Sequence, residues 1–264
     1  MIAEAPLAPC ADRYAELNGV RLRFRDEGQG PAVLLIHGWT LDLELWNGQA
    51  QALRTSWRVI RHDRRGFGLS TGSPAIDADV HDAASLLQRL GVAGVAVVGM
   101  SQGARVALRL AAARPDLVAR LVLDGAPPDC DRDDAAGDAD LSMGAFRALA
   151  QHSGMGAFRQ QWAAHEFVRL RTRDAAAAQL LAAMLERYPG RDLLESGGIS
   201  QPTLILNGEF DTVPRRNFGR ALAQRLPAAR YALVPQAGHL ANLDNPAAYS
   251  QLLREFCGSN IHPS

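Results

Sequence analysis

The chain contains no lysine, so all 28 of its basic residues are arginine. No lysine side chain is therefore available for Schiff-base chemistry or as a catalytic ammonium group. Cysteine is also scarce: Cys10, Cys130 and Cys257 are far apart, odd in number and form no C-x-x-C motif. That pattern predicts neither a disulfide framework nor a zinc site, and it is typical of proteins in a reducing compartment.

Neither sign of charge is in excess, because 28 acidic residues balance the 28 arginines. The composition therefore gives no electrostatic argument for nucleic acid or a membrane surface as a partner. No apolar run approaches the length of a membrane span. Residues 1–12 have neither a basic segment nor a long apolar segment, so no signal peptide is predicted and a cytoplasmic location is expected.

Apolar residues make up 47% of the 264 residues, enough to form a large core. Short apolar runs predict eight strands, with a hairpin turn at Asn18-Gly19 between the first two. Helical spacing occurs between most of the later strands, which predicts an α/β fold with a mostly parallel sheet flanked by helices. The predicted strands are residues 14–17, 20–25, 32–36, 58–61, 95–98, 121–123, 203–206 and 231–234, and helices are predicted over 80–90 and 216–226.

One long segment departs from this alternation. Residues 128–195 contain no predicted strand, only helix-compatible runs around 143–151, 157–168 and 174–188. We therefore predict a core domain formed by residues 13–127 and 196–258, with residues 128–195 forming an all-helical cap, or lid, between strands 6 and 7. A separate helical domain is the alternative, but about 65 residues is small for independent stability.

A serine flanked by glycines occurs in the segment Gly99-Met100-Ser101-Gln102-Gly103. A buried-type strand precedes this G-x-S-x-G pattern, and apolar residues at helical spacing follow it. A serine held in a tight turn between strand and helix has the geometry of a nucleophile elbow, with its hydroxyl directed at a substrate. Ser101 is therefore the candidate nucleophile.

Two later segments follow the elbow in the order acid, then histidine, that this architecture predicts. Asp211 follows the seventh strand, and His239 follows the eighth in the segment Gly238-His239. Parallel strands bring the loops at their carboxyl ends to one edge of the sheet, where ligands bind in open α/β sheets. We therefore expect His239 to be the base and Asp211 the acid, with Asp124 after the sixth strand as the competing acid.

The same edge of the sheet should hold the groups that stabilise an oxyanion. Gln102, the residue after the serine, has its backbone N–H at a helix N-terminus, and Trp39 in the loop after the third strand is the natural second donor. The segment 63–70 contains arginines and two glycines, and it is predicted to be a structural loop held by ion pairs. This chemistry requires no metal and no organic cofactor.

Large apolar side chains of the predicted cap and elbow are candidates to line a substrate pocket. At helical spacing the same residues also suit the interior of the cap itself, so both interpretations stay open. The candidate substrate contacts are Met100, Met143, Phe146 and Trp162.

Together these segments resemble the α/β-hydrolase superfamily across residues 14–256. His37-Gly38-Trp39 together with the segment 63–70 is similar to bacterial arylesterases and cofactor-free perhydrolases, although this chain has Thr40 where those proteins usually have proline. Enol-lactonases and pimeloyl-type methyl-ester esterases share the loop plan. The resemblance implies a serine hydrolase acting on small to medium acyl esters or on a lactone. The alternatives are an enol-lactonase, a carbon–carbon bond hydrolase, or a ligand-binding protein without catalysis.

Overall fold

The computed structural model describes residues 10–127, 143–188, 202–225 and 229–258. All eight predicted strands are present and form one sheet in the order β1-β2-β4-β3-β5-β6-β7-β8. β2 pairs antiparallel with β1 and β4, and the pairs from β4 to β8 are all parallel. The strands are β1 (Arg13–Leu17), β2 (Val20–Glu27), β3 (Ala32–Ile36), β4 (Arg58–His62), β5 (Val95–Met100), β6 (Val118–Asp124), β7 (Thr203–Gly208) and β8 (Ala229–Val234).

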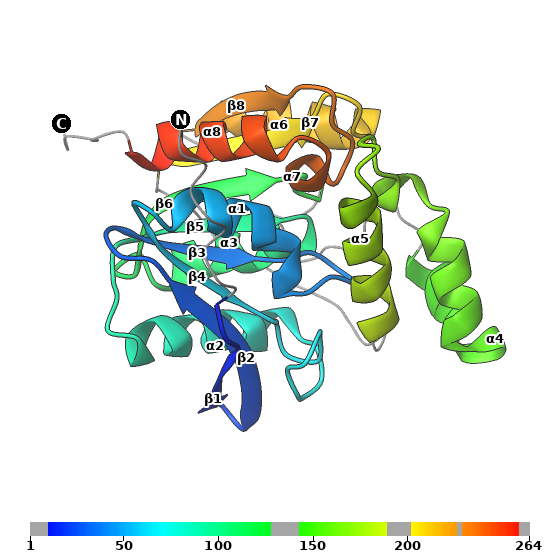
Figure 1. The fold of residues 1–264 in the computed structure, drawn as a ribbon, viewed down its shortest axis with the longest axis horizontal. Helices are drawn as coiled ribbons and strands as arrows, with labels where there is room; N and C mark the ends of the chain where they lie inside the picture. The colour runs from blue at the N-terminus through cyan, green and yellow to red at the C-terminus, as the bar shows by residue number, and fades with distance from the viewer. Residues whose placement is uncertain (1–9, 128–142, 189–201, 226–228, 259–264) are drawn as a thin grey trace, which may run out of the picture.

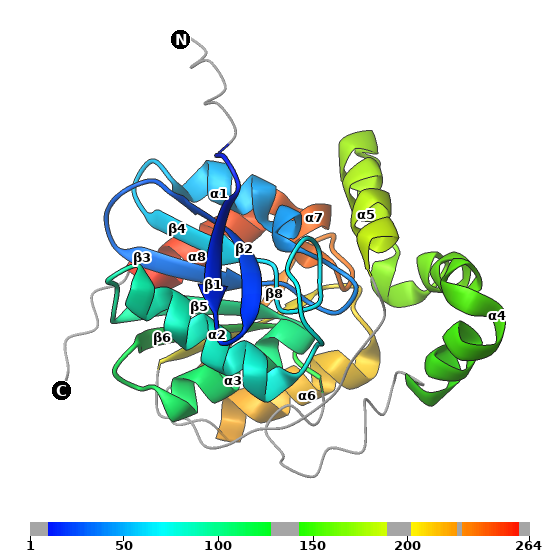
Figure 2. The ribbon, with the colours of Figure 1, turned by 90° about the horizontal axis from the view of Figure 1, so that it is seen from below.

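Helices cover both faces of the sheet, so its central strands are buried on both sides (Figures 1 and 2). Alternate residues along β5 enter two different cores: Val98 lies in the core beneath α1 and α8, and Val97 lies in the core beneath α2, α3 and α6. This explains why β5 is a continuous apolar run. The helices of the two faces are α1 (Asn47–Leu53), α2 (Ile76–Arg89), α3 (Gln102–Ala113), α6 (Val213–Arg225), α7 (Ala241–Asp244) and α8 (Pro246–Gly258), with the 3-10 turn η1 (Leu43–Trp46) before α1.

Between β6 and β7 the described residues 143–188, here called the helical insertion, contain no strand. They form α4 (Met143–Ala163), the short 3-10 turn η2 (Glu166–Val168) and α5 (Ala175–Arg187). α4 is interrupted at Gly154, where φ is 81°, so it consists of two helical pieces. The predicted domain boundaries at 128 and 195 lie outside the described residues.

The insertion lies beyond the carboxyl ends of the parallel strands, at the right of Figure 1. The loops that carry the predicted site residues end at this same edge, so the insertion and the site face each other. None of the helices in the described parts of the chain combines the length and apolar character needed to cross a bilayer.

Candidate active site

Ser101 occupies a sharp turn between β5 and α3. Its φ of 52° and ψ of −118° are a strained conformation for a residue with a side chain. The flanking glycines make this turn possible: a Cβ at Gly99 would lie 2.3 Å from the carbonyl oxygen of Gly103, and one at Gly103 would lie 2.4 Å from that of Ile36. The predicted elbow is therefore present in the geometry of the chain, with α3 packed directly against the end of β3.

The three predicted catalytic side chains lie together at the carboxyl edge of the sheet. His239 Nε2 is 3.3 Å from Ser101 Oγ, and His239 Nδ1 is 3.2 Å from Asp211 Oδ1. Both His239 and Asp211 are buried, whereas Ser101 is partly exposed. A hydroxyl, an imidazole and a carboxylate in this order are the arrangement in which a base activates a nucleophile and an acid orients the base.

Asp211 is held as an anion by its surroundings. Burial alone would raise its pKa, but the charge and hydrogen bond of His239, together with Arg215, lower it to about 2. The side-chain amide of Asn207 donates to Oδ2 at 2.8 Å, and the backbone N–H of Thr212 donates to Oδ1 at 2.8 Å. These donors fix the carboxylate in the plane from which it meets His239.

The competing acid, Asp124, has a different environment. It ends β6 and is fully buried, and its Oδ2 accepts a hydrogen bond from the hydroxyl of Tyr249 at 2.9 Å. Burial and the nearby charge of Asp211 raise its pKa well above the ordinary range. No hydrogen bond joins Asp124 to His239 among the described residues, so the geometry favours Asp211 as the partner of the histidine.

The loop after β3 approaches the serine closely. A Cβ on Gly38 would lie 2.8 Å from Met100 Sδ and 3.3 Å from Ser101 Cβ, so only glycine fits there without displacement. Trp39 follows immediately, and its backbone N–H has no acceptor among the described residues. This amide therefore lies close to Ser101, and its N–H is not used by any of the described residues.

His37 sets the direction of that amide. The backbone N–H of Arg64 donates to His37 Nε2 at 2.9 Å, so the ring proton must be on Nδ1, which donates to the carbonyl of Gly38 at 2.8 Å. Burial and the charge of Arg64 lower the pKa of His37 well below its usual value, which keeps the ring neutral. Because the C=O and N–H of a trans peptide point in opposite directions, fixing the Gly38 carbonyl also fixes the Trp39 N–H.

The second predicted donor residue, Gln102, is the first residue of α3, where backbone N–H groups and the helix dipole favour an anion. Its side-chain oxygen accepts a hydrogen bond from Arg64 Nη1 at 2.8 Å. The same guanidinium donates to Asp79 Oδ2, and Arg65 pairs with Asp82. The predicted ion pairing of the 63–70 loop is thus present, and it connects that loop to the elbow.

Arg215, which the sequence analysis did not assign, also contacts this site, together with Phe167 of the helical insertion. Arg215, which is 1% exposed, donates to the carbonyl of Gly125 at 2.6 Å, and its guanidinium carbon lies 4.4 Å from the ring centre of Phe167. The Phe167 ring lies 4.6 Å from that of His239. The sequence gives no distinctive signal for this buried cation. Arg215 is simply an arginine four residues after Asp211, and such a spacing is common.

The predicted substrate contacts lie in a shared apolar region. Met100 is 1% exposed, and its sulfur is close to Gly38. Phe146 and Trp162, both from α4, pack against each other and against the ring of Trp39. Met143 is the first residue of α4, and its side chain lies outside what the structure describes. Their role as substrate contacts remains a prediction.

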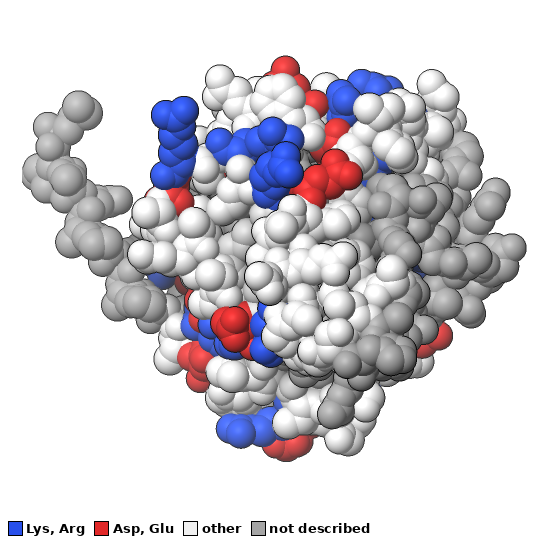
Figure 3. Space-filling view, turned by 90° about the vertical axis from the view of Figure 1, so that its right-hand side faces the viewer, with Lys and Arg blue, Asp and Glu red and all other residues white. Residues whose placement is uncertain are grey.

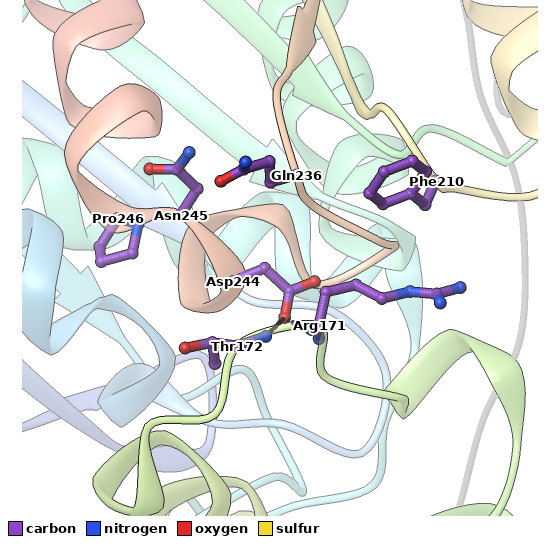
Figure 4. Close-up of a pocket in the computed structure, with 7 residues that line it drawn as sticks. All are labelled: Arg171, Thr172, Phe210, Gln236, Asp244, Asn245 and Pro246. Atoms are coloured by element: carbon purple, nitrogen blue, oxygen red, sulfur yellow. Dashed lines mark hydrogen bonds between the residues drawn. The ribbon is translucent and has the colours of Figure 1, made fainter.

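A separate hollow of about 560 Å³ lies where the helical insertion meets the loops after β7 and β8 (Figure 4). In it, Asp244 accepts hydrogen bonds from the backbone of Arg171 and Thr172 in the helical insertion and, at 2.7 Å, from that of Gly238. The hollow therefore marks a junction that ties the insertion to the residue before His239. It is lined by Arg171, Thr172, Phe210, Gln236, Asp244, Asn245 and Pro246.

The described residues include no cluster of three or more His, Cys, Asp or Glu side chains arranged to hold a metal ion. The groups that contact one another at the carboxyl edge of the sheet are the Ser101 hydroxyl, the His239 imidazole and the Asp211 carboxylate. Such a set suits attack on a carbonyl carbon followed by proton transfer.

Comparison with known proteins agrees with this architecture. The family model described as the alpha/beta hydrolase fold matches residues 31–246, most of the chain. The chain therefore belongs to the α/β-hydrolase fold family, as its motifs predicted.

Relatives of the chain within that family are named for different activities. A pimeloyl-[acyl-carrier protein] methyl ester esterase of Chromobacterium violaceum is 32% identical, over 86% of this chain and 94% of the relative. Among solved structures, a thermophilic esterase of Thermogutta terrifontis has a TM-score of 0.79 at 26% identity, covering 93% of this chain and 97% of that one. An enol-lactonase of Burkholderia xenovorans has a TM-score of 0.79 at 25% identity, covering 94% of this chain and 100% of that one.

Proposed function

We propose that this protein is a serine hydrolase that cleaves carboxylic esters through Ser101, His239 and Asp211. The observation that carries the proposal is the continuous chain of contacts from Ser101 Oγ through both ring nitrogens of His239 to Asp211. It occurs at a strained elbow, where the hydroxyl is partly exposed and its partners are buried. The esterases among the relatives of this chain support the same reaction class.

The reaction begins when Ser101 Oγ attacks the ester carbonyl carbon and His239 Nε2 takes the hydroxyl proton. The carbonyl electron pair moves onto oxygen, and the backbone N–H groups of Trp39 and Gln102 stabilise that oxyanion. Asp211 holds the Nδ1 proton and stabilises the imidazolium. His239 then protonates the departing alkoxide, which leaves an acyl-enzyme on Ser101. Water deprotonated by His239 attacks the acyl carbon. When the carbonyl re-forms, the bond to Ser101 Oγ breaks, His239 returns its proton to that oxygen, and the acid is released.

Small to medium acyl esters suit the surroundings of this site. The rings of Trp39, Phe146, Trp162 and Phe167 belong to one buried apolar cluster, and the Phe167 ring lies against that of His239. The side of the molecule that bears the helical insertion has a broad area without charged side chains (Figure 3). Such surroundings favour an uncharged acyl group. Residues 128–195 would act as the cap over the core domain of 13–127 and 196–258, and the sparse cysteines support a cytoplasmic location.

Lactone hydrolysis is the second candidate, because the enol-lactonase matches this chain as well as the esterase does. The two reactions share every proton transfer described above and differ only in whether the leaving alkoxide stays attached to the acyl group. Comparing kcat/KM for aryl esters and for enol-lactones of equal carbon number distinguishes them. A larger value for the lactones would make the protein a lactonase.

The proposal is tested by assaying the purified protein with nitrophenyl acetate, butyrate and octanoate beside the Ser101→Ala variant. We expect the variant to lose at least about a thousandfold in kcat, because the nucleophile is absent. A fluorophosphonate should add once to the wild-type protein, at Ser101, as shown by peptide mass. A folded wild-type protein that neither turns over these esters nor takes the label would contradict the proposal.

A further inference from the structure

The loop after β3 contacts the helical insertion at Trp39, Thr40 and Asp42. The first of these contacts is aromatic: the Trp39 ring, on a residue that is 9% exposed, is surrounded by rings of the insertion at centre-to-centre distances from 4.8 to 6.2 Å. Contacts of this kind hold a ring from several sides. The surrounding rings are those of Phe146, Phe158, Trp162 and Tyr188.

The second contact is a hydrogen bond made by the next residue. Trp162 Nε1 donates to Thr40 Oγ1 at 2.9 Å, and Thr40 is completely buried. The φ of Thr40 is 64°, in the left-handed region that a β-branched residue rarely adopts and that proline cannot adopt. A residue stays in such a conformation only where its surroundings hold it there. Trp162 is one of the groups that do so.

The third contact is an ion pair. Arg187 Nε, at the end of α5, donates to Asp42 Oδ2 at 2.6 Å, and Asp42 is 1% exposed. The arginine side chain is itself 30% exposed, so this pair is partly screened by solvent. Of the two polar contacts, the hydrogen bond between Trp162 and Thr40 is the one that is buried at both ends.

We propose that Thr40 is a positioning residue through which Trp162 of the insertion holds the oxyanion-binding loop in place. The proposal rests on the proposed function, in which the Trp39 amide binds the oxyanion. That amide must lie within about 3 Å of the oxyanion, and donors of this kind act only when they are already in position. Because Gly38 is packed against Met100 and Ser101, a shift of the loop changes the distance between the amide and the reacting oxygen.

It follows that the helical insertion supports the oxyanion hole from outside, by holding the loop that carries the Trp39 amide. The three contacts span Trp39 to Asp42, immediately after the Gly38–Trp39 peptide whose carbonyl is fixed by His37. The core thus fixes one end of the loop and the insertion fixes the other. Loss of the hydrogen bond between Trp162 and Thr40 should therefore weaken transition-state stabilisation more than it weakens substrate binding.

The test compares Thr40→Val with Thr40→Ser. Valine keeps the branched shape but removes the acceptor for Trp162, whereas serine keeps that acceptor. We expect Thr40→Val to lower kcat for nitrophenyl butyrate by roughly ten- to a hundredfold with KM within about threefold of the wild-type value. Thr40→Ser should retain kcat within about threefold. A role in folding alone would not produce this split between kcat and KM at a temperature where all variants are folded.

Trp162→Phe supplies the partner variant, because it removes the donor and keeps an aromatic ring in the cluster. We expect the double variant Thr40→Val/Trp162→Phe to have about the same kcat as the poorer of the single variants, since both remove one interaction. Ala177→Gly in α5 is the control: it lowers helix stability without touching Thr40, and its kcat should match the wild type.

The outcomes separate this proposal from the proposed function. A wild-type protein that hydrolyses the ester, with Thr40→Val keeping wild-type kcat, overturns the positioning role and leaves the esterase assignment intact. Effects of the two single variants that multiply in the double variant also overturn it, because the two side chains would then act independently. A folded wild-type protein with no turnover and no label on Ser101 overturns both proposals.

Discussion

Asp124 is the last residue of β6, and Asp211 lies in the loop after the neighbouring strand β7. Their surroundings shift their pKa values in opposite directions. Burial alone would raise the pKa of Asp211, but His239, Arg215 and the donor from Asn207 lower it to about 2. The pKa of Asp124 is raised by burial and by the charge of Asp211, and among the described residues its carboxyl group accepts a hydrogen bond from the Tyr249 hydroxyl alone. Carboxyl groups whose environments differ in this way have different roles.

This contrast predicts opposite results for two amide substitutions. Asp211→Asn should lower kcat by roughly a thousand- to ten-thousandfold, because an amide neither stabilises the imidazolium nor holds the same tautomer of His239. Asp124→Asn should stay within about threefold of wild type, since its amide oxygen can still accept from Tyr249. The measurement is kcat and kcat/KM on nitrophenyl acetate. If Asp124→Asn is the more damaging change, Asp124 is the acid and the assignment of Asp211 is wrong.

At the scale of elements, the parts of the fold that depend on local pattern could be predicted from the sequence. Asn18 and Gly19 both have positive φ, as the predicted two-residue hairpin requires, and β5 was recognisable from its unbroken apolar run. The placement of Ser101, Asp211 and His239 at one edge of the sheet followed from the alternation of strands and helices. These features depend on neighbouring residues, or on the rule that parallel strands end at one edge of the sheet.

Features decided by tertiary contact could not be predicted. α2 begins at Ile76, before the expected residue 80. Its first turn contains two aspartates, and one of them, Asp79, is buried because it pairs with Arg64. The hydrogen bond between Trp162 and Thr40 joins residues that are 122 positions apart in the sequence, so no local pattern predicts it. Whether Trp162 is a core residue or a substrate contact stayed open for the same reason: helical spacing shows which side of a helix is apolar, not what covers it.

The junction of α3 with β3 gives a prediction at this scale. Gly103→Ala would place a Cβ 2.4 Å from the carbonyl oxygen of Ile36 and 2.5 Å from that of His37, so α3 must move away from the strand. We expect a loss of several kcal/mol in the free energy of unfolding by urea, and a fall in kcat as the elbow separates from the Trp39 loop. Gly156→Ala in α4 is the matched control. Its Cβ meets nothing within 4 Å, so it should be neutral or stabilise by up to about 1 kcal/mol.

If Gly103→Ala and Gly156→Ala lower the free energy of unfolding by the same amount, the close approach of α3 to β3 at Gly103 does not contribute to stability. A stable Gly103→Ala protein with wild-type kcat would show that the elbow can shift without affecting the site. Either result would contradict the view that glycine is required where α3 meets β3.

Across the whole molecule, the absence of lysine is reflected in how charge is buried. Arginine forms planar, often bidentate pairs with carboxylates, and such pairs fill the region between β2, β4 and α2. Because each of these arginines has an oppositely charged partner, the protein can bury several ionic groups in this region. The pairs include Arg58 with Asp26, Arg61 with Glu27, Arg64 with Asp79 and Arg65 with Asp82.

His62 stands apart from these pairs and makes the stability of the whole protein depend on pH. It is fully buried at the end of β4, and neither ring nitrogen has a hydrogen-bond partner among the described residues. Burial lowers its pKa from 6.5 to about 4, with Arg64 adding to that effect and Asp82 opposing it. Protons therefore bind the unfolded chain more readily, and stability that is present above about pH 6.5 is lost as the pH falls toward 4.

Replacing this imidazole should remove that part of the pH dependence. Between about pH 7.5 and about pH 4.5, we expect wild-type protein to lose about 2 to 3 kcal/mol more unfolding free energy than His62→Leu does. The comparison cancels the buried His37, the raised pKa of Asp63 and the lowered pKa of Asp211, because both proteins share them. Urea unfolding at each pH supplies the measurement. Parallel curves for the two proteins would mean that His62 accepts its proton in the folded state as readily as in the unfolded chain.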